Sequence, residues 1–198
     1  MKKITLSIFL LATFLFTQAQ DQLNNHLAEA KTNYASDNLE DARFALQQSL
    51  NELYIVISKQ ILETLPETLG DTKAQSEGDQ YNGTAMGYTG VFIDRTYASA
   101  DQKKVIDVSL VHDSPLMSSI GSFLASPLMN LASGRKSLKI DGYKSALETS
   151  ESDAKTYTIY IPFAQSLITL TFNGYDSETE VIGLANQLPI KEIVEVAQ

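Results

Sequence analysis

The chain has 198 residues, with 15 lysines and arginines against 24 aspartates and glutamates. An acidic surface of this kind repels nucleic-acid phosphates and anionic lipid headgroups, so neither nucleic-acid binding nor docking on a membrane surface is expected. The sequence contains no cysteine, which excludes disulfides, thiol catalysis, thiolate metal sites and lipid attachment at a cysteine.

Residues 1–19 have the pattern of a secretory signal peptide. Lys2 and Lys3 precede an apolar run over 4–16, and small residues follow it. The run is shorter than the roughly 20 apolar residues that cross a bilayer, so we expect cleavage after Ala19 rather than an uncleaved anchor. The mature chain would carry 13 basic and 24 acidic residues, a net charge of −11, and would be periplasmic or secreted with no membrane span.

Residues 20–66 predict an α-helical hairpin. Apolar or small residues recur at helical spacing in two stretches, which a short polar break separates. Asp37, with Glu40 three positions later, is expected to cap the second helix, and Pro66 ends it. The predicted inward face of this second helix consists of Leu39, Ala42, Leu46, Leu50, Leu53, Ile57, Ile61 and Leu65.

The amino-acid composition and the predicted secondary structure change after the hairpin. Residues 67–86 combine glycines with polar side chains, and we expect a linker loop with little regular structure. Residues 88–97 and 105–112 predict two strands, the second of which alternates apolar and polar residues as a half-buried strand does. The predicted sheet domain therefore covers 87–198.

Residues 115–131 are rich in leucine and methionine and predict a helix. Ser114-Pro115 is typical of a helix start, and Ser126-Pro127 repeats it, so we expect a kink or two short helices. Two interpretations of this Met-rich helix stay open: it covers one face of the sheet, or it forms an adaptable binding surface. The regular apolar stripe favours the first, and consists of Leu116, Ile120, Leu124, Leu128 and Leu131.

Three more strands are predicted at 136–149, 155–163 and 167–173. The first is expected to bend at Gly142, and a tight turn at Ala164-Gln165 joins the other two.

The C-terminal residues predict two helices. Ser177, with Glu180, has the pattern of a capping box, and Ile190 begins a last short amphipathic stretch. The order after the hairpin is then ββαβββα. Short connections favour a mostly antiparallel sheet of about five strands with helices packed on it, an α+β domain packed with the hairpin.

The sequence contains two histidines, His26 and His112, which lie far apart. His112 is followed by Asp113 and Ser114, the residue types of a hydrolase triad, but neighbouring residues of a strand point to opposite faces. Ser114 is better explained as a helix cap, and no G-x-S-x-G or metal-binding motif occurs. We therefore predict no catalytic, cofactor-binding or metal-ligating residues and no cofactor.

Several stretches resemble a family of exported proteins of Gram-negative bacteria to which no activity is assigned. They are LEDARFALQQSLNEL at 39–53, DSPLM at 113–117 with SPLM at 126–129, KIDGYK at 139–144 and IPFAQSLI at 161–168. The resemblance implies export and a shared fold, and supplies no site residues. More loosely, the order of elements after Gly87 is similar to PsbP/Mog1-like domains, which implies an accessory or binding role.

These observations favour a soluble non-enzymatic protein of the periplasm that binds an envelope protein or a small ligand. The alternative is a carrier of an apolar ligand or lipid, held between the Met-rich helix 115–131 and the sheet. A hydrolase that uses Ser114 and His112 is the enzyme alternative. The sequence does not specify the oligomeric state.

Overall fold

The computed structural model describes residues 21–85, 88–114, 117–124, 126–150 and 155–197, so the predicted signal peptide lies outside the described residues. The chain divides into two compact units, residues 1–56 and 57–198. The division falls within helix α2 (Leu39–Thr64). Among the described residues, no helix combines the length and the apolar character that a membrane crossing requires.

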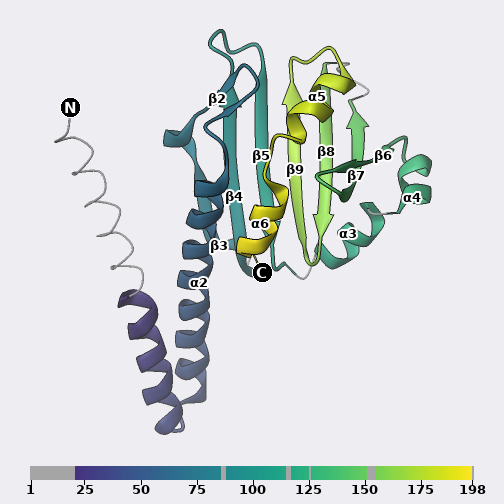
Figure 1. Cartoon of the computed structure of the whole chain (residues 1–198). Helices are drawn as coiled ribbons and strands as arrows, with labels where there is room; N and C mark the ends of the chain where they lie inside the picture. The colour runs from purple at the N-terminus through teal and green to yellow at the C-terminus, as the bar shows by residue number, and fades with distance from the viewer. Residues whose placement is uncertain (1–20, 86–87, 115–116, 125, 151–154, 198) are drawn as a thin grey trace, which may run out of the picture. The chain divides into compact units, whose positions relative to one another are not determined.

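The first unit contains most of the predicted helical hairpin, up to residue 56 of α2. Residues 21–35 are helical, and α2 runs back beside them in the antiparallel sense (Figure 1). The predicted cap is wrong by one residue: Asp37 has a φ of 60°, so it makes the turn, and Asn38 is the residue before the helix. The Asn38 carbonyl accepts a hydrogen bond from the Ala42 N–H. The Asn38 side-chain Nδ2 donates to the Asp41 carboxylate at 2.5 Å.

The second unit is built on one antiparallel sheet. Its strand order is β1-β2-β4-β5-β9-β8-β7-β6, and β3 also pairs with β4, beyond the end of β2. The strands are β1 (Thr68–Leu69), β2 (Thr72–Ala74), β3 (Gln80–Ala85), β4 (Tyr88–Ala98), β5 (Val105–His112), β6 (Lys136–Ile140), β7 (Tyr143–Thr149), β8 (Thr156–Phe163) and β9 (Ser166–Asn173).

The α+β class and the antiparallel sheet are confirmed, but the predicted count of five strands is too low. The predicted linker 67–86 contains β1, β2, the short 3-10 helix η1 (Ser76–Gly78) and β3. β2 and β3 pair along the outer edge of β4, and β1 pairs with β2. The predicted strand 136–149 is a hairpin, since Asp141 and Gly142 both have positive φ and turn β6 back into β7.

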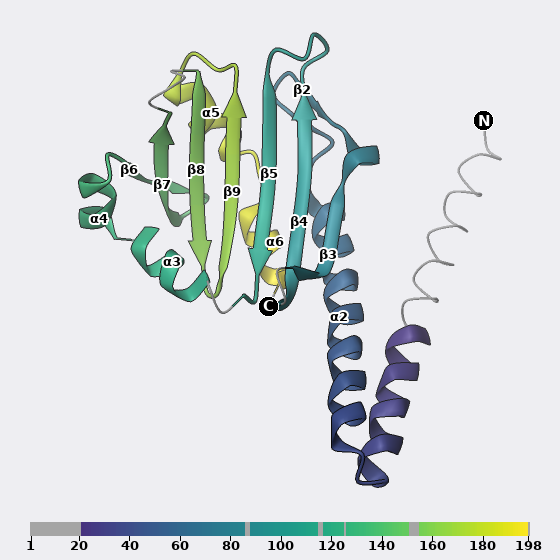
Figure 2. The same ribbon diagram turned by 180° about the vertical axis from the view of Figure 1, so that it is seen from behind.

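Helices cover one face of the sheet more than the other. Viewed from behind, the middle of β4, β5, β9 and β8 carries no helix (Figure 2), whereas α5 (Glu178–Ala185) and α6 (Ile190–Ala197) lie on the opposite face (Figure 1). The covered face supplies the core, which includes Ile106, Ile159 and Leu170. Ser177 precedes α5 as predicted, but its side chain makes no capping hydrogen bond.

Two short helices, α3 (Met117–Leu124) and α4 (Pro127–Ala132), replace the single Met-rich helix, one of the two forms predicted. They lie at the β8–β6 side of the sheet (Figure 2). The Cβ position of Gly121 in α3 lies 3.5 Å from Pro162 Cβ in β8. A small residue thus lets α3 approach the sheet closely.

Candidate functional site

The two helices of the hairpin are held together mainly by small residues. The buried positions on facing sides are Ala30, Ala42, Ala45 and Ser49. Small side chains allow close contact of the helix backbones, but they bury little apolar surface. The larger apolar side chains of the hairpin therefore lie elsewhere.

A stripe of large apolar side chains is exposed on each helix of the hairpin. Leu27 and Tyr34 are 45% and 72% exposed on the first helix. On α2 the sequence pattern predicted an inward leucine face, and that prediction is wrong for its first half. Leu39, Leu46, Leu50 and Leu53 are all at least 40% exposed, and only Ala42 of that stretch is buried.

Both stripes lie on the same side of the hairpin. With about 100° of rotation per residue, the stripe on the first helix is displaced by roughly 50° from Ala30. The stripe on α2 is displaced by roughly 80° from the small-residue contact of that helix, in the same rotational sense. In an antiparallel pair, displacements in the same sense place both stripes on one side. We call this surface, formed by Leu27, Tyr34, Leu39, Leu46, Leu50 and Leu53, the leucine face.

The charged residues that lie near the leucine face are basic. By the same helical geometry, Lys31 lies about 40° from Leu27, and Arg43 lies about 20° from Leu50. The acidic residues of these helices within residues 21–56 all lie more than about 100° from the centre of their stripe; they are Asp21, Glu29, Glu40, Asp41 and Glu52. The leucine face thus has a basic border although the hairpin as a whole is acidic.

A second exposed apolar surface lies on α3 and α4. Of the predicted inward stripe, Leu116 lies outside the described residues and only Leu124 is buried. Ile120 is 42% exposed, and Leu128 and Leu131 are each 76% exposed. The interpretation of this helix as a cover for the sheet holds only in part: α3 approaches β8 at Gly121, but most of the stripe stays exposed.

A groove of about 300 Å³ lies between α4 and the β6–β7 hairpin. Pro127 and Asn130 line it from α4, Ser137, Leu138 and Lys139 from β6, and Lys144 and Ser145 from β7. The groove is open to solvent and combines apolar side chains with two lysines.

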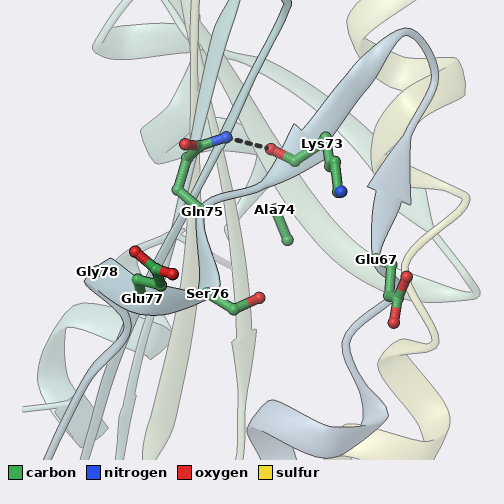
Figure 3. Close-up of a pocket in the computed structure, with 7 residues that line it drawn as sticks. All are labelled: Glu67, Lys73, Ala74, Gln75, Ser76, Glu77 and Gly78. Atoms are coloured by element: carbon green, nitrogen blue, oxygen red, sulfur yellow. Dashed lines mark hydrogen bonds between the residues drawn. The ribbon is translucent and has the colours of Figure 1, made fainter.

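A larger groove, of about 530 Å³, follows β2 and η1. Glu67, Lys73, Gln75 and Glu77 contribute its polar side chains, and the Gln75 Nε2 donates to the Lys73 carbonyl at 3.1 Å. The carboxylates of Glu67 and Glu77 lie at opposite ends of this set of residues (Figure 3). Because the two acids do not converge, the groove presents no paired carboxylates for acid–base chemistry.

A third groove, of about 460 Å³, is lined by ion pairs that neutralise one another. Lys104 Nζ lies 2.8 Å from Glu180 and 3.4 Å from Asp71, and Glu180 is the main reason that the pKa of Lys104 is raised. A hydrogen bond from the Ser99 hydroxyl lowers the pKa of Asp101 to about 2, so this carboxylate stays charged. These contacts join loops at one end of the sheet.

The structure pairs His112 with Ser166 rather than with Ser114. The His112 Nδ1 lies 2.5 Å from the Ser166 Oγ, and its ring stacks on Phe163 with 6.3 Å between centroids. Ser166 has no solvent exposure. Burial lowers the pKa of His112, while the Asp113 charge and a hydrogen bond with the Ala197 backbone oppose that shift. A serine that substrate cannot reach is not a nucleophile, so the pair is a packing contact.

His26, the other histidine, lies in the first helix, with its Nδ1 3.7 Å from a Glu29 oxygen. In the part of the chain that the structure describes, no three His, Asp or Glu side chains gather as a metal site would require. Comparisons with protein-family models, with curated proteins and with solved structures gave no match.

Proposed function

We propose that the protein is an exported, non-enzymatic binding module that binds an envelope protein through the leucine face. The observation that carries the proposal is the exposure of Leu46, Leu50 and Leu53 at 54%, 40% and 42%, beside a helix contact made of small residues. Contiguous exposed apolar surface on an otherwise polar protein is typical of an interaction site. An amphipathic helix is the partner element that fits an elongated helical face.

The border of the leucine face specifies the charge of this partner. Lys31 and Arg43 are both exposed and flank the stripes. An acidic residue on each side of the partner's apolar face would meet them, which favours association and orients the helix. We therefore propose an amphipathic helix with acidic flanks as the bound segment.

Site-specific photo-crosslinking in the periplasm tests this function. A photoreactive phenylalanine at Leu46 should form a crosslink to another envelope protein, and the same residue at Phe44 should not. Phe44 is a matched control because it is 59% exposed and apolar, yet lies about 150° around the helix from the stripe. Arg43→Glu should weaken the crosslink from position 46.

Two results would contradict the proposal. Equal crosslinking from positions 44 and 46 would show that the leucine face is not selective. A crosslink from position 46 only to a second copy of the chain would show self-association instead of binding to a different protein.

The groove beside α4 favours a second candidate function, the binding of an amphiphilic ligand. Its volume of about 300 Å³ is at the lower end of the range for small-molecule sites. The exposed Leu128 and Leu131 extend the apolar surface of α4 for a longer ligand. Native mass spectrometry of protein purified from its own host should then show added mass, and its absence would oppose the carrier function.

A further inference from the structure

The groove between α4 and the β6–β7 hairpin contains two unpaired positive charges. Lys139 and Lys144 are directly opposite each other in the β6–β7 ladder, and both are exposed and line the groove. Like charges at directly opposite positions of a sheet repel. The acid at the tip of this hairpin, Asp141, is paired with Lys191 at 3.7 Å, and no acidic group among the described residues pairs with Lys139 or Lys144.

Asn130, which lines the groove, has a buried acceptor without a donor. Asn130 is 1% exposed, and its Nδ2 donates to the Leu124 carbonyl at 2.8 Å and to Ser137 Oγ at 3.2 Å. Its Oδ1 is buried and has no hydrogen-bond partner. The Leu124 carbonyl fixes this orientation of the amide, because two oxygens placed there would repel. A buried acceptor without a partner is costly, and a ligand hydroxyl would satisfy it.

The four basic residues near the groove are Arg135, Lys136, Lys139 and Lys144. Arg135 pairs with Glu148 and Lys136 pairs with Glu178, so these two charges are neutralised. Lys139 and Lys144 are left as a small positive patch on a protein that is acidic overall. Such a patch attracts an anionic ligand to this end of the sheet.

We propose that the groove binds a phosphate group that carries a neighbouring hydroxyl, which names the ligand class of the second candidate function and rests on it. Lys139 and Lys144 hold the phosphate oxygens, and the hydroxyl donates to Asn130 Oδ1. Glycerol phosphate has this chemistry, both as a soluble compound and as the headgroup of phosphatidylglycerol. The adjacent Leu128 and Leu131 would contact the acyl chains of a lipid.

Calorimetric titration of the mature protein tests the ligand class. Glycerol 1-phosphate should bind, and n-propyl phosphate, which has the same length and lacks the hydroxyls, should bind about tenfold more weakly or worse, because a site built to accept a hydroxyl rejects an analogue without it. Equal affinity for the two compounds would overturn the proposal.

A pair of double variants tests the lysines. Lys139→Met with Lys144→Met should abolish binding of glycerol 1-phosphate. Lys103→Met with Lys155→Met changes the net charge equally and should leave the affinity unchanged, because both lysines line the groove at another end of the sheet. All four are exposed side chains, so the variants are expected to fold. Retained binding in the first variant would overturn the proposal.

Vesicle sedimentation distinguishes the two sources of the phosphate. Binding to phosphatidylglycerol vesicles and not to phosphatidylcholine vesicles, with loss in the Lys139→Met and Lys144→Met variant, supports a lipid headgroup. Binding of glycerol 1-phosphate without vesicle binding supports a soluble ligand, and binding of neither overturns the proposal. In native mass spectrometry, a bound ligand without phosphate would overturn this inference and leave the carrier function intact.

Discussion

Arg95 and Asp79 form a two-point ion pair that is almost entirely removed from solvent, with side chains 8% and 12% exposed. The Arg95 Nε donates to Asp79 Oδ1 at 2.9 Å, and its Nη2 donates to Oδ2. The Nη1 donates to the Leu62 carbonyl at 2.9 Å, near the end of α2. One guanidinium thus joins β4, the segment before β3 and the last turn of α2.

Breaking this pair from one side should be strongly destabilising. Arg95→Met leaves a buried carboxylate without its partner, and we expect a loss of about 3–5 kcal/mol in the free energy of unfolding, measured by urea titration. Lys103→Met removes an ion pair whose side chains are 82% and 57% exposed, and should leave the midpoint nearly unchanged. Arg95→Met combined with Asp79→Leu should recover part of the loss; no recovery would show that the charge of Asp79 is not the cause.

The stability of the fold should fall in mildly acidic solution because of His112. Burial is the main cause that lowers its pKa below the ordinary value of 6.5. Between the two pKa values the unfolded chain binds a proton that the folded chain does not, so the free energy of unfolding decreases as the pH falls below about 6.5. Urea titrations from pH 8 to pH 5 should show this decrease in the wild type.

Two histidine variants identify the group responsible. His112→Gln should flatten the decrease between pH 6.5 and the lower pKa, whereas His26→Gln should retain it. If the His112→Gln protein follows the wild-type curve, the pH dependence comes from other groups.

Gly174 should tolerate no side chain. Its φ is +81°, and a Cβ built there would lie 2.0 Å from the Lys103 carbonyl oxygen. Gly142 has a φ of +88°, and no atom lies within 4 Å of its Cβ position. Gly142→Ala should therefore lower the free energy of unfolding only by the energy of placing alanine in the left-handed backbone conformation, about 1–2 kcal/mol. Gly174→Ala should lower the free energy of unfolding by more than Gly142→Ala does. Equal losses would mean that the loop containing Lys103 moves away from the new Cβ without loss of stability.

Local signals predicted most elements but not all of the sheet. The helices, β4, β5, β8 and β9 follow from apolar periodicity and turn residues. The β6–β7 hairpin had a local signal that the sequence reading missed, the Asp141-Gly142 pair typical of a two-residue turn. By contrast, β1 and β2 are very short and β3 is mostly polar. β2 and β3 are strands because the edge of β4 offers backbone partners, and β1 pairs in turn with β2.

The candidate sites were harder to predict, because periodicity shows which residues share a face but not whether anything covers it. Leu128 and Leu131 belong to a regular stripe and are nevertheless exposed. Lys139 and Lys144 lie opposite each other only because the chain turns at Asp141-Gly142, where a continuous strand was predicted. The buried Asn130 gives no signal in the sequence, since its burial depends on β6 lying beside α4.

The hairpin allows a direct test of this difference between a shared face and a covered one. Ala45 is 1% exposed and Leu46 is 54% exposed, although the sequence pattern placed Leu46 inward. Ala45→Leu should overpack the helix contact and cost about 1–3 kcal/mol in the free energy of unfolding, measured by circular dichroism during urea titration. Leu46→Ala should change that free energy by less than about 0.5 kcal/mol, as an exposed position does. A loss of about 2 kcal/mol or more for Leu46→Ala, which is typical of a core leucine, would show that the leucine face is covered within the isolated protein and is not available to a partner.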